Sequence, residues 1–180
     1  MAANRSKKKK STRGRPKKGQ QNQEIRGEIT IFIALAVCIL LVLSNFGMGG
    51  IVGEAVSSVL FGLFGVMAYV LPFVAFGITA FLISNRGNAH AYIKITAGAV
   101  LFLLLTAILE LIFYQYKPGT SLFSYYHAGS IHQSTGGLTG GCIIAVFCPL
   151  IGEIGTYVIL FVLCIICVRS VHLNHIHLVN

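Results

Sequence analysis

The sequence predicts an all-α polytopic membrane protein with four transmembrane helices, on the strength of three observations. Of the 180 residues, 55% are hydrophobic and only 11% are charged, and the mean hydropathy is +0.78. A soluble domain of this size cannot bury so much apolar surface. Ten of the fourteen Lys and Arg residues precede residue 27. The apolar residues form four long blocks, at residues 29–48, 51–84, 91–114 and 138–168.

These features divide the chain into three expected parts. Residues 1–26 are basic and have no apolar periodicity, which predicts a disordered tail. Residues 27–170 hold the four apolar blocks and form the transmembrane domain. Residues 171–180 are a short C-terminal end.

The first block, residues 29–48, has the length and composition of one span. A bilayer core of about 30 Å needs roughly 20 helical residues. The block contains twelve Ile, Leu, Val or Phe residues and no charge. At roughly −0.3 to −0.6 kcal/mol each, these side chains favour insertion by about 4 to 7 kcal/mol. No small-residue cleavage site follows the block, so we do not expect a signal peptide.

The second and fourth blocks are too long for one upright helix. At about 1.5 Å per residue, residues 51–84 would reach roughly 50 Å. Glycine and proline favour a break near residues 62–65 in the second block and near residues 149–152 in the fourth.

Each break separates a short outer helix from a span. The expected spans are residues 65–84 and 152–169, and the third block, residues 91–114, is a span by itself. The segments before the breaks, residues 51–63 and 138–150, become two short glycine-rich helices at the outer face.

The two long blocks also repeat each other at a distance of 87 residues. The aligned glycines are Gly49 with Gly136, Gly50 with Gly137, Gly53 with Gly140, and Gly65 with Gly152. Bulky residues recur at the same helical spacing in both copies. We interpret this as an internal duplication of a two-helix unit with a longer loop in the second copy. Chance similarity between apolar strings is the alternative.

The repeated glycines are candidate helix-packing residues. The pairs have GxxxG spacing, which allows two helix backbones to approach closely in lipid. One interpretation is a subunit-contact surface at the outer leaflet, and the other is that the glycines only permit sharp bends. The candidates are Gly49, Gly53, Gly65, Gly136, Gly140 and Gly152.

The distribution of basic residues predicts the orientation. With the N-terminus inside, the inner segments hold the ten basic residues of the tail together with Arg86, Lys94 and Arg169, and the outer segments hold only Lys117. The positive-inside rule then places both termini in the cytoplasm. We expect a multi-pass protein of a bacterial cell membrane.

Glu110 is the one acidic residue well inside the third block. A carboxylate within a span suggests function by default. Its position near the outer end, before Tyr114 and Lys117, favours a structural role at the membrane interface.

The tail contains a short candidate for DNA binding. Its Arg-Gly-Arg-Pro core resembles an AT-hook, in which an extended Arg-Gly-Arg inserts both arginines into the narrow minor groove of A·T-rich DNA. Attraction to anionic lipid beneath the first span explains the same charges without DNA. The candidate residues are Arg13, Gly14, Arg15, Pro16, Lys17 and Lys18.

The sequence offers no constellation for catalysis. It has no phosphate-binding loop of the G-x-x-x-x-G-K-[ST] type, no G-x-S-x-G elbow and no H-E-x-x-H pair, so we expect neither an enzyme nor a cofactor. The five cysteines are expected to be packing residues. At the C-terminal end, His172, His175 and His177 are either metal ligands or residues without a role.

Two segments carry a family resemblance. GEAVSSVLFGLFGVMAYVLPF and GGLTGGCIIAVFCPLIGEIGTYVIL, together with the basic tail and four spans, resemble the N-terminal membrane domain of the FtsK/SpoIIIE DNA translocases. The resemblance covers residues 29–169. Its most recognisable pattern is F-G-x-x-A-Y-x-x-P, formed here by Phe64, Gly65, Ala68, Tyr69 and Pro72.

The resemblance implies an anchoring and oligomerising domain that acts in chromosome segregation at the division or sporulation septum. In that family the domain holds a cytoplasmic hexameric ATPase motor, which this sequence lacks. The expected partners are membrane lipid, further copies of the chain, DNA through the tail, division or septum proteins, and the cytoplasmic motor if the chain is a fragment. The alternative function is a small transporter or channel subunit with duplicated broken helices.

Overall fold

The computed structural model describes the backbone of residues 18–85, 89–114 and 116–176, and side-chain surroundings for residues 25–85, 91–114, 116–131 and 133–170. Within these ranges the chain is helical and has no strand. The elements are α1 (Lys18–Asn45), α2 (Gly50–Phe64), the 3₁₀ helix η1 (Gly65–Tyr69), α3 (Leu71–Ser84), α4 (Ala89–Phe113), α5 (Leu122–His132) and α6 (Gly137–Ile176).

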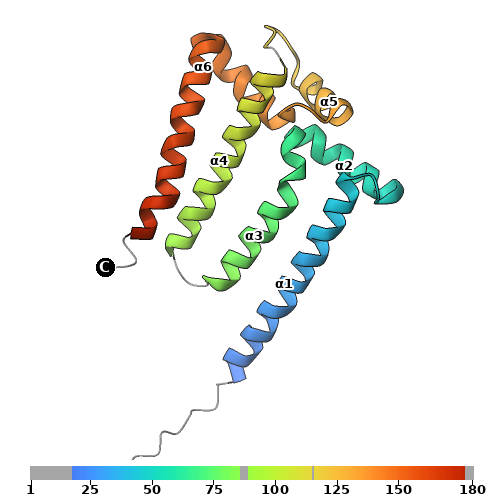
Figure 1. Ribbon diagram of the computed structural model, residues 1–180, viewed down its shortest axis with the longest axis vertical. Helices are drawn as coiled ribbons and strands as arrows, with labels where there is room; N and C mark the ends of the chain where they lie inside the picture. Colours follow the sequence, from blue (N-terminus) through green and yellow to red (C-terminus); the bar gives the residue numbers. More distant parts are fainter. Residues whose placement is uncertain (1–17, 86–88, 115, 177–180) are drawn as a thin grey trace, which may run out of the picture.

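The helices form a row of four long segments with a cap at one end (Figure 1). The long segments α1, α3, α4 and the second half of α6, residues 153–176, run side by side. The cap consists of α2, α5 and the first half of α6, residues 137–151. The start of α1 and the end of α6 both lie at the opposite end of the row. The predicted all-α polytopic fold is confirmed.

Among the residues that the structure describes, four helical segments are long and apolar enough to cross a membrane: Ile25–Asn45, Gly50–Tyr69, Ala91–Phe113 and Gly137–Ser170. The second of these joins α2 to η1, whereas the arrangement in Figure 1 places α3 among the long segments. We follow the arrangement, because the backbone breaks at Gly65. The five residues of η1, Val70 and the 14 residues of α3 together reach about 30 Å, which is enough to span.

The two predicted breaks are confirmed, and glycine makes both of them. Gly65 has φ 55° and ψ −137°, and Gly152 has φ 75° and ψ 170°, conformations open almost only to glycine. At the start of the two short helices, Gly50 and Gly137 also take positive φ, 61° and 70°. Both pairs are separated by 87 positions, so the duplication seen in the sequence is repeated in the backbone.

Two expected boundaries differ from the structure. Helix α1 already begins at Lys18, inside the stretch expected to be tail, and α6 continues to Ile176, beyond residue 170. Most residues between Lys18 and Ile25 are Gln, Asn, Glu or Gly, without proline. A helix that has nucleated in the apolar block extends through such residues at little cost.

Helix α5 was not predicted. It lies in the longer connection of the second repeat and begins at the N-cap Ser121, whose side chain accepts a hydrogen bond from the Ser124 N–H. Its C-cap is Gln133, a non-glycine residue with positive φ, 51°.

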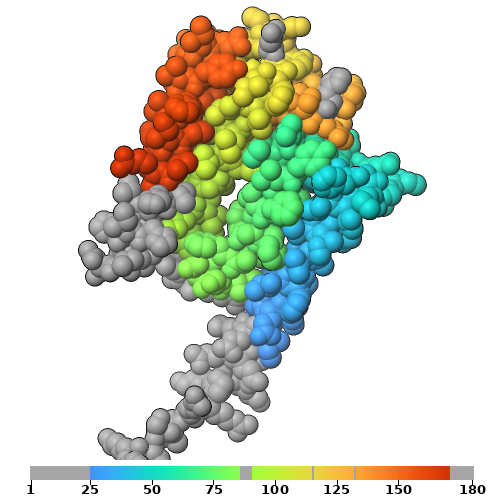
Figure 2. Space-filling view, viewed as in Figure 1, coloured from blue at the N-terminus to red at the C-terminus, as the bar shows by residue number. Residues whose placement is uncertain are grey.

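The main core lies where α4, α5 and α6 meet. Its buried residues are Leu104, Ala107, Leu111, Tyr125, Ile144, Cys148 and Leu160. The first repeat is built around the contact of α1 with α3, which buries Cys38 and Pro72. By contrast, α3 and α4 make few contacts, and gaps follow the line between them in the space-filling view (Figure 2). The two repeats are therefore joined mainly through the cap.

Candidate helix-packing site in the cap

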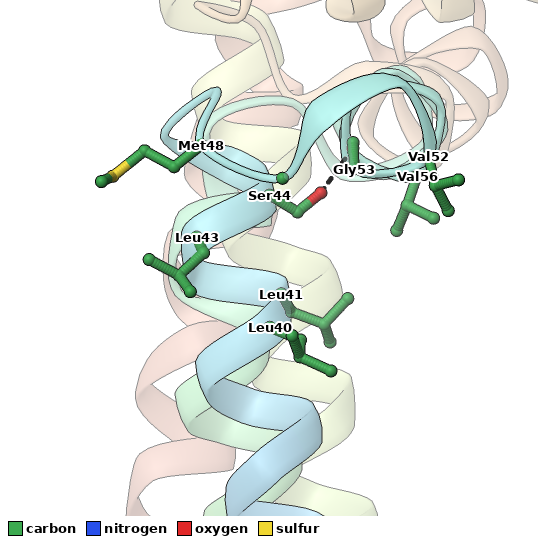
Figure 3. Close-up of a pocket in the computed structure, with 9 residues that line it drawn as sticks. Leu40, Leu41, Leu43, Ser44, Met48, Val52, Gly53 and Val56 are labelled. Carbon is green, nitrogen blue, oxygen red and sulfur yellow. Dashed lines mark hydrogen bonds between the residues drawn. The ribbon is translucent and has the colours of Figure 1, made fainter.

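The glycine pair of the first repeat packs on the end of its own first span. A Cβ on Gly49 would lie 3.1 Å from Ser44 Cα, and a Cβ on Gly53 would lie 3.4 Å from Ser44 Oγ. The Ser44 hydroxyl donates a hydrogen bond to the Gly53 carbonyl oxygen, which joins α1 to α2 (Figure 3). The small residues allow α2 to fold back directly over the end of α1.

The glycine pair of the second repeat makes the equivalent contact with α4. A Cβ on Gly140 would lie 2.5 Å from the Thr106 carbonyl oxygen, and a Cβ on Gly136 would overlap that oxygen. The Thr139 hydroxyl bonds to Thr106 Oγ1 at 3.3 Å. Thr106 therefore lies against the glycine pair of the second repeat as Ser44 does in the first, but the hydrogen bonds differ. The Thr106 hydroxyl donates to the Leu103 carbonyl oxygen of its own helix, and the Thr139 hydroxyl also donates to the Leu63 carbonyl oxygen of α2 at 2.9 Å.

A second contact joins the two repeats to each other. The N–H of Val66, just after the break at Gly65, donates to the Thr135 carbonyl oxygen at 2.8 Å. A Cβ on Gly65 would overlap that same oxygen, and a Cβ on Gly137 would lie 2.6 Å from Gly65 N. The end of one short helix therefore crosses the start of the other at backbone distance, which only glycine permits.

Glu110 fixes this crossing from α4. Its side chain has no exposed surface, and Oε2 accepts a hydrogen bond from the Gly136 N–H at 2.6 Å. Its other oxygen, Oε1, has no hydrogen-bond partner among the described residues. The hydrogen bond from the Gly136 N–H gives Glu110 a structural role, which the sequence favoured, and its position relative to the membrane interface stays a prediction. The carboxyl is buried because it satisfies a backbone N–H at the start of α6, where a helix has free donors.

Two aromatic rings of α5 pack directly on two further glycines of the cap. A Cβ on Gly62 of α2 would overlap the ring of Tyr126, and a Cβ on Gly141 of α6 would overlap the ring of Tyr125. Tyr125 is fully buried, and burial raises the pKa of its hydroxyl. These contacts were not foreseen, because nothing in the sequence pairs α5 with either glycine.

The six candidate glycines do not act alike. Five of them lie against other segments of the same chain, whereas a Cβ on Gly152 would meet nothing within 4 Å. At Gly152 the positive φ alone explains glycine, as the bend interpretation requires. The subunit-contact interpretation stays a prediction.

Other candidate residues fall outside the described part. Arg13 to Lys17 precede it, Lys18 is described only as the first residue of α1, and the side chains of the three C-terminal histidines are not described. Within the described residues, no three His, Cys, Asp or Glu side chains are placed to hold a metal ion. The five cysteines are all free thiols.

Two pockets flank the junction of α1 and α2. One is an apolar groove of about 390 Å³ between the end of α1 and the start of α2, lined by Leu40, Leu43, Val52 and Val56 among others (Figure 3). The other, of about 170 Å³, is polar and includes Asn45, Glu54 and Gln133. Both are at the cap. A third cavity, of about 80 Å³, lies midway along α1 and α3 beside Cys38 and Pro72, and it is small and lined mainly by apolar residues.

Comparison with known families gives one match. The model of the 4TM region of DNA translocase FtsK/SpoIIIE matches residues 42–179. The match includes the end of α1 and every later helix, and it starts later than the resemblance seen in the sequence. No curated protein and no solved structure matches the chain.

Proposed function

Because the chain belongs to the family of four-helix membrane regions of FtsK/SpoIIIE DNA translocases, we propose that it anchors such a translocase in the bacterial cell membrane and helps its copies to assemble. The membrane-anchoring character follows from the family. Assembly, and action in chromosome segregation at a division or sporulation septum, are the parts that need testing.

One observation carries the proposal. The cap joins the two repeats at one end of the bundle. The start of α1 and the end of α6 both lie at the other end (Figure 1). Arg26, Lys94 and Arg169 all belong to that second end, and the positive-inside rule assigns such an end to the cytoplasm. A motor in the cytoplasm needs an anchor with this arrangement.

Orientation is tested with reporter fusions in living cells. Reporters active only in the cytoplasm, placed before Lys18 and after Ile176, are expected to be active, and the same reporter inserted at Gly119 is expected to be inactive. Opposite results for the two ends would overturn the orientation and with it the anchor role.

The cellular role is tested by localisation and by interference. A fluorescent fusion of the full chain is expected to concentrate at the division septum, whereas an unrelated four-span protein with the same label stays spread over the membrane. Overproduction is expected to leave unsegregated DNA at septa, because free anchors occupy the places of complete translocases. Uniform labelling together with normal segregation would contradict the septal role and leave the membrane anchor intact.

A further inference from the structure

The polar pocket in the cap is formed by both repeats. Asn45 comes from the end of α1, and Glu54, Ser57 and Ser58 come from one face of α2, where residues three and four apart are neighbours. Gln133, which caps α5 in a left-handed conformation, closes the pocket from the second repeat. At about 170 Å³ it is smaller than the roughly 300–1,000 Å³ of ligand pockets, so it fits a single side-chain head.

The pocket has an excess of hydrogen-bond acceptors. Asn45 is 5% exposed, and its Nδ2 donates to the Ala68 carbonyl oxygen at 2.6 Å, which leaves Oδ1 without a partner. Glu54 is exposed, and among the described residues it forms no ion pair. The accessible carboxylate of Glu54 in the lining makes the site selective for a positively charged donor.

An ammonium group fits this chemistry best. It carries three donors, enough for the Glu54 carboxylate and the serine hydroxyls of the lining. An amine-bearing phospholipid also carries a phosphate, and no basic side chain lines the pocket to bind it. A divalent metal ion is disfavoured because Glu54 is the only carboxylate in the lining. The occupant is therefore a basic side chain.

This chain presents one suitable lysine at the same end. Between residues 95 and 168, Lys117 is the only Lys or Arg, and it is exposed. It begins the turn Lys117-Pro118-Gly119-Thr120, in which the Thr120 N–H donates to the Lys117 carbonyl oxygen at 3.2 Å and Gly119 has φ 84°. Proline and glycine at these positions make a rigid turn, so the lysine is held out from the α4–α5 connection.

We propose that the polar pocket of one copy receives the Lys117 side chain of a neighbouring copy. This inference rests on the proposed role in assembly and names the contact that provides it. This contact between two different sites of the chain is made either head-to-tail, which closes into a ring when the rotation allows, or reciprocally across a two-fold axis. It lies beside the Ser44–Gly53 contact of α1 with α2, so the first repeat's glycine packing positions the pocket.

The contact is tested by zero-length cross-linking of the full chain. Isotope-labelled and unlabelled chains are mixed in detergent, reconstituted together in vesicles and treated with a water-soluble carbodiimide, which joins a carboxylate to an amine only when they touch. Mass spectrometry is expected to find Glu54 joined to Lys117 in peptides that combine labelled with unlabelled chains. Lys117 joined only to Glu153, or only within one chain, would overturn the inference.

Charge reversal provides the second arm. Glu54→Lys and Lys117→Glu are each expected to weaken self-association in vesicles roughly tenfold, and the double exchange is expected to restore most of it. Glu153→Lys is the matched control, because Glu153 is exposed but does not line the pocket. If Glu54→Lys weakens assembly and Lys117→Glu does not, the pocket binds another amine and the inference fails. If the unmodified chain is monomeric, the assembly role itself fails.

Discussion

Glu110 of α4 accepts a hydrogen bond from the backbone N–H of Gly136, 26 residues further along the chain, at 2.6 Å. Gly136 also lies against the Thr106 carbonyl oxygen, one turn earlier in α4. The contact between α4 and the start of α6 therefore depends on the Glu110 carboxyl group, which accepts the hydrogen bond, and on glycine at position 136, which allows the close approach. Both can be tested separately.

Replacement of Glu110 separates the acceptor from the charge. Glu110→Gln keeps a carbonyl oxygen for the Gly136 N–H and is expected to leave the free energy of unfolding close to that of the original chain. Glu110→Ala leaves the N–H without a partner and opens a cavity, which is expected to cost at least about 1–3 kcal/mol. Denaturant titration in micelles measures both. Equal stability of the two variants would show that the hydrogen bond contributes nothing.

Replacement of Gly136 tests the missing side chain. In Gly136→Ala the new Cβ overlaps the Thr106 carbonyl oxygen, a backbone atom that cannot move aside, so we expect a loss of about 3 kcal/mol or more. Gly77→Ala in α3 is the control, because a Cβ there meets nothing within 4 Å and alanine favours the helix by about 0.5–1 kcal/mol. A stable, fully folded Gly136→Ala variant would contradict the described packing.

Gly65 and Gly152 occupy equivalent places in the two repeats but differ in surroundings. Gly152→Ala meets only backbone strain, about 1–3 kcal/mol. Gly65→Ala adds a clash with the Thr135 carbonyl oxygen and is expected to be clearly the worse of the two. Thermal unfolding of the purified variants gives the order. The reverse order would mean that the two repeats do not cross as described.

The tail prediction concerns affinity for DNA. If the Arg-Gly-Arg-Pro core acts as a hook, a tail peptide with Arg13→Ala and Arg15→Ala is expected to lose A·T-rich duplex binding more strongly than a peptide with Lys8→Ala and Lys9→Ala. The two peptides have equal charge, so counterion release is matched between them. Equal losses of affinity, measured by fluorescence anisotropy, would indicate that the tail binds lipid or DNA through its positive charge alone.

Thiol labelling distinguishes an anchor from a transporter. Cys148 is 4% exposed within the core of α4, α5 and α6. Cys142, earlier in α6, is half-buried. In single-cysteine variants, a membrane-impermeant maleimide is expected to leave Cys148 unmodified until the protein is denatured. Labelling of both positions, with protection of both by one solute, would favour the transporter alternative.

The sequence predicted the long elements well because length and composition decide them. A span needs roughly 20 apolar residues, and a block of 34 residues with glycines in its middle must break. The breaks at Gly65 and Gly152 followed from that argument alone. The 87-residue repeat was visible because glycine is required at the same backbone positions in both copies.

The missed features depend on partners distant in the chain. The neighbours of Glu110, Tyr114 and Lys117, suggested a structural role near the membrane interface, but they could not identify its hydrogen-bond partner, Gly136. Helix α5 has no clear apolar periodicity, and its one local signal was Ser121 as an N-cap. Which glycine receives which aromatic ring is decided by the crossing of α2, α5 and α6 in space.

The sparse contact between α3 and α4 has a mechanical consequence. A pull on the C-terminal end of α6 is transmitted first to α4, its closely packed neighbour, and reaches α1 and α3 mainly through the cap. Under such a load the contacts in the cap are expected to hold, while the pair α4 and α6 moves away from the pair α1 and α3. In a single-molecule pulling experiment on α6, α4 and α6 are then expected to be displaced together before α1 and α3 move.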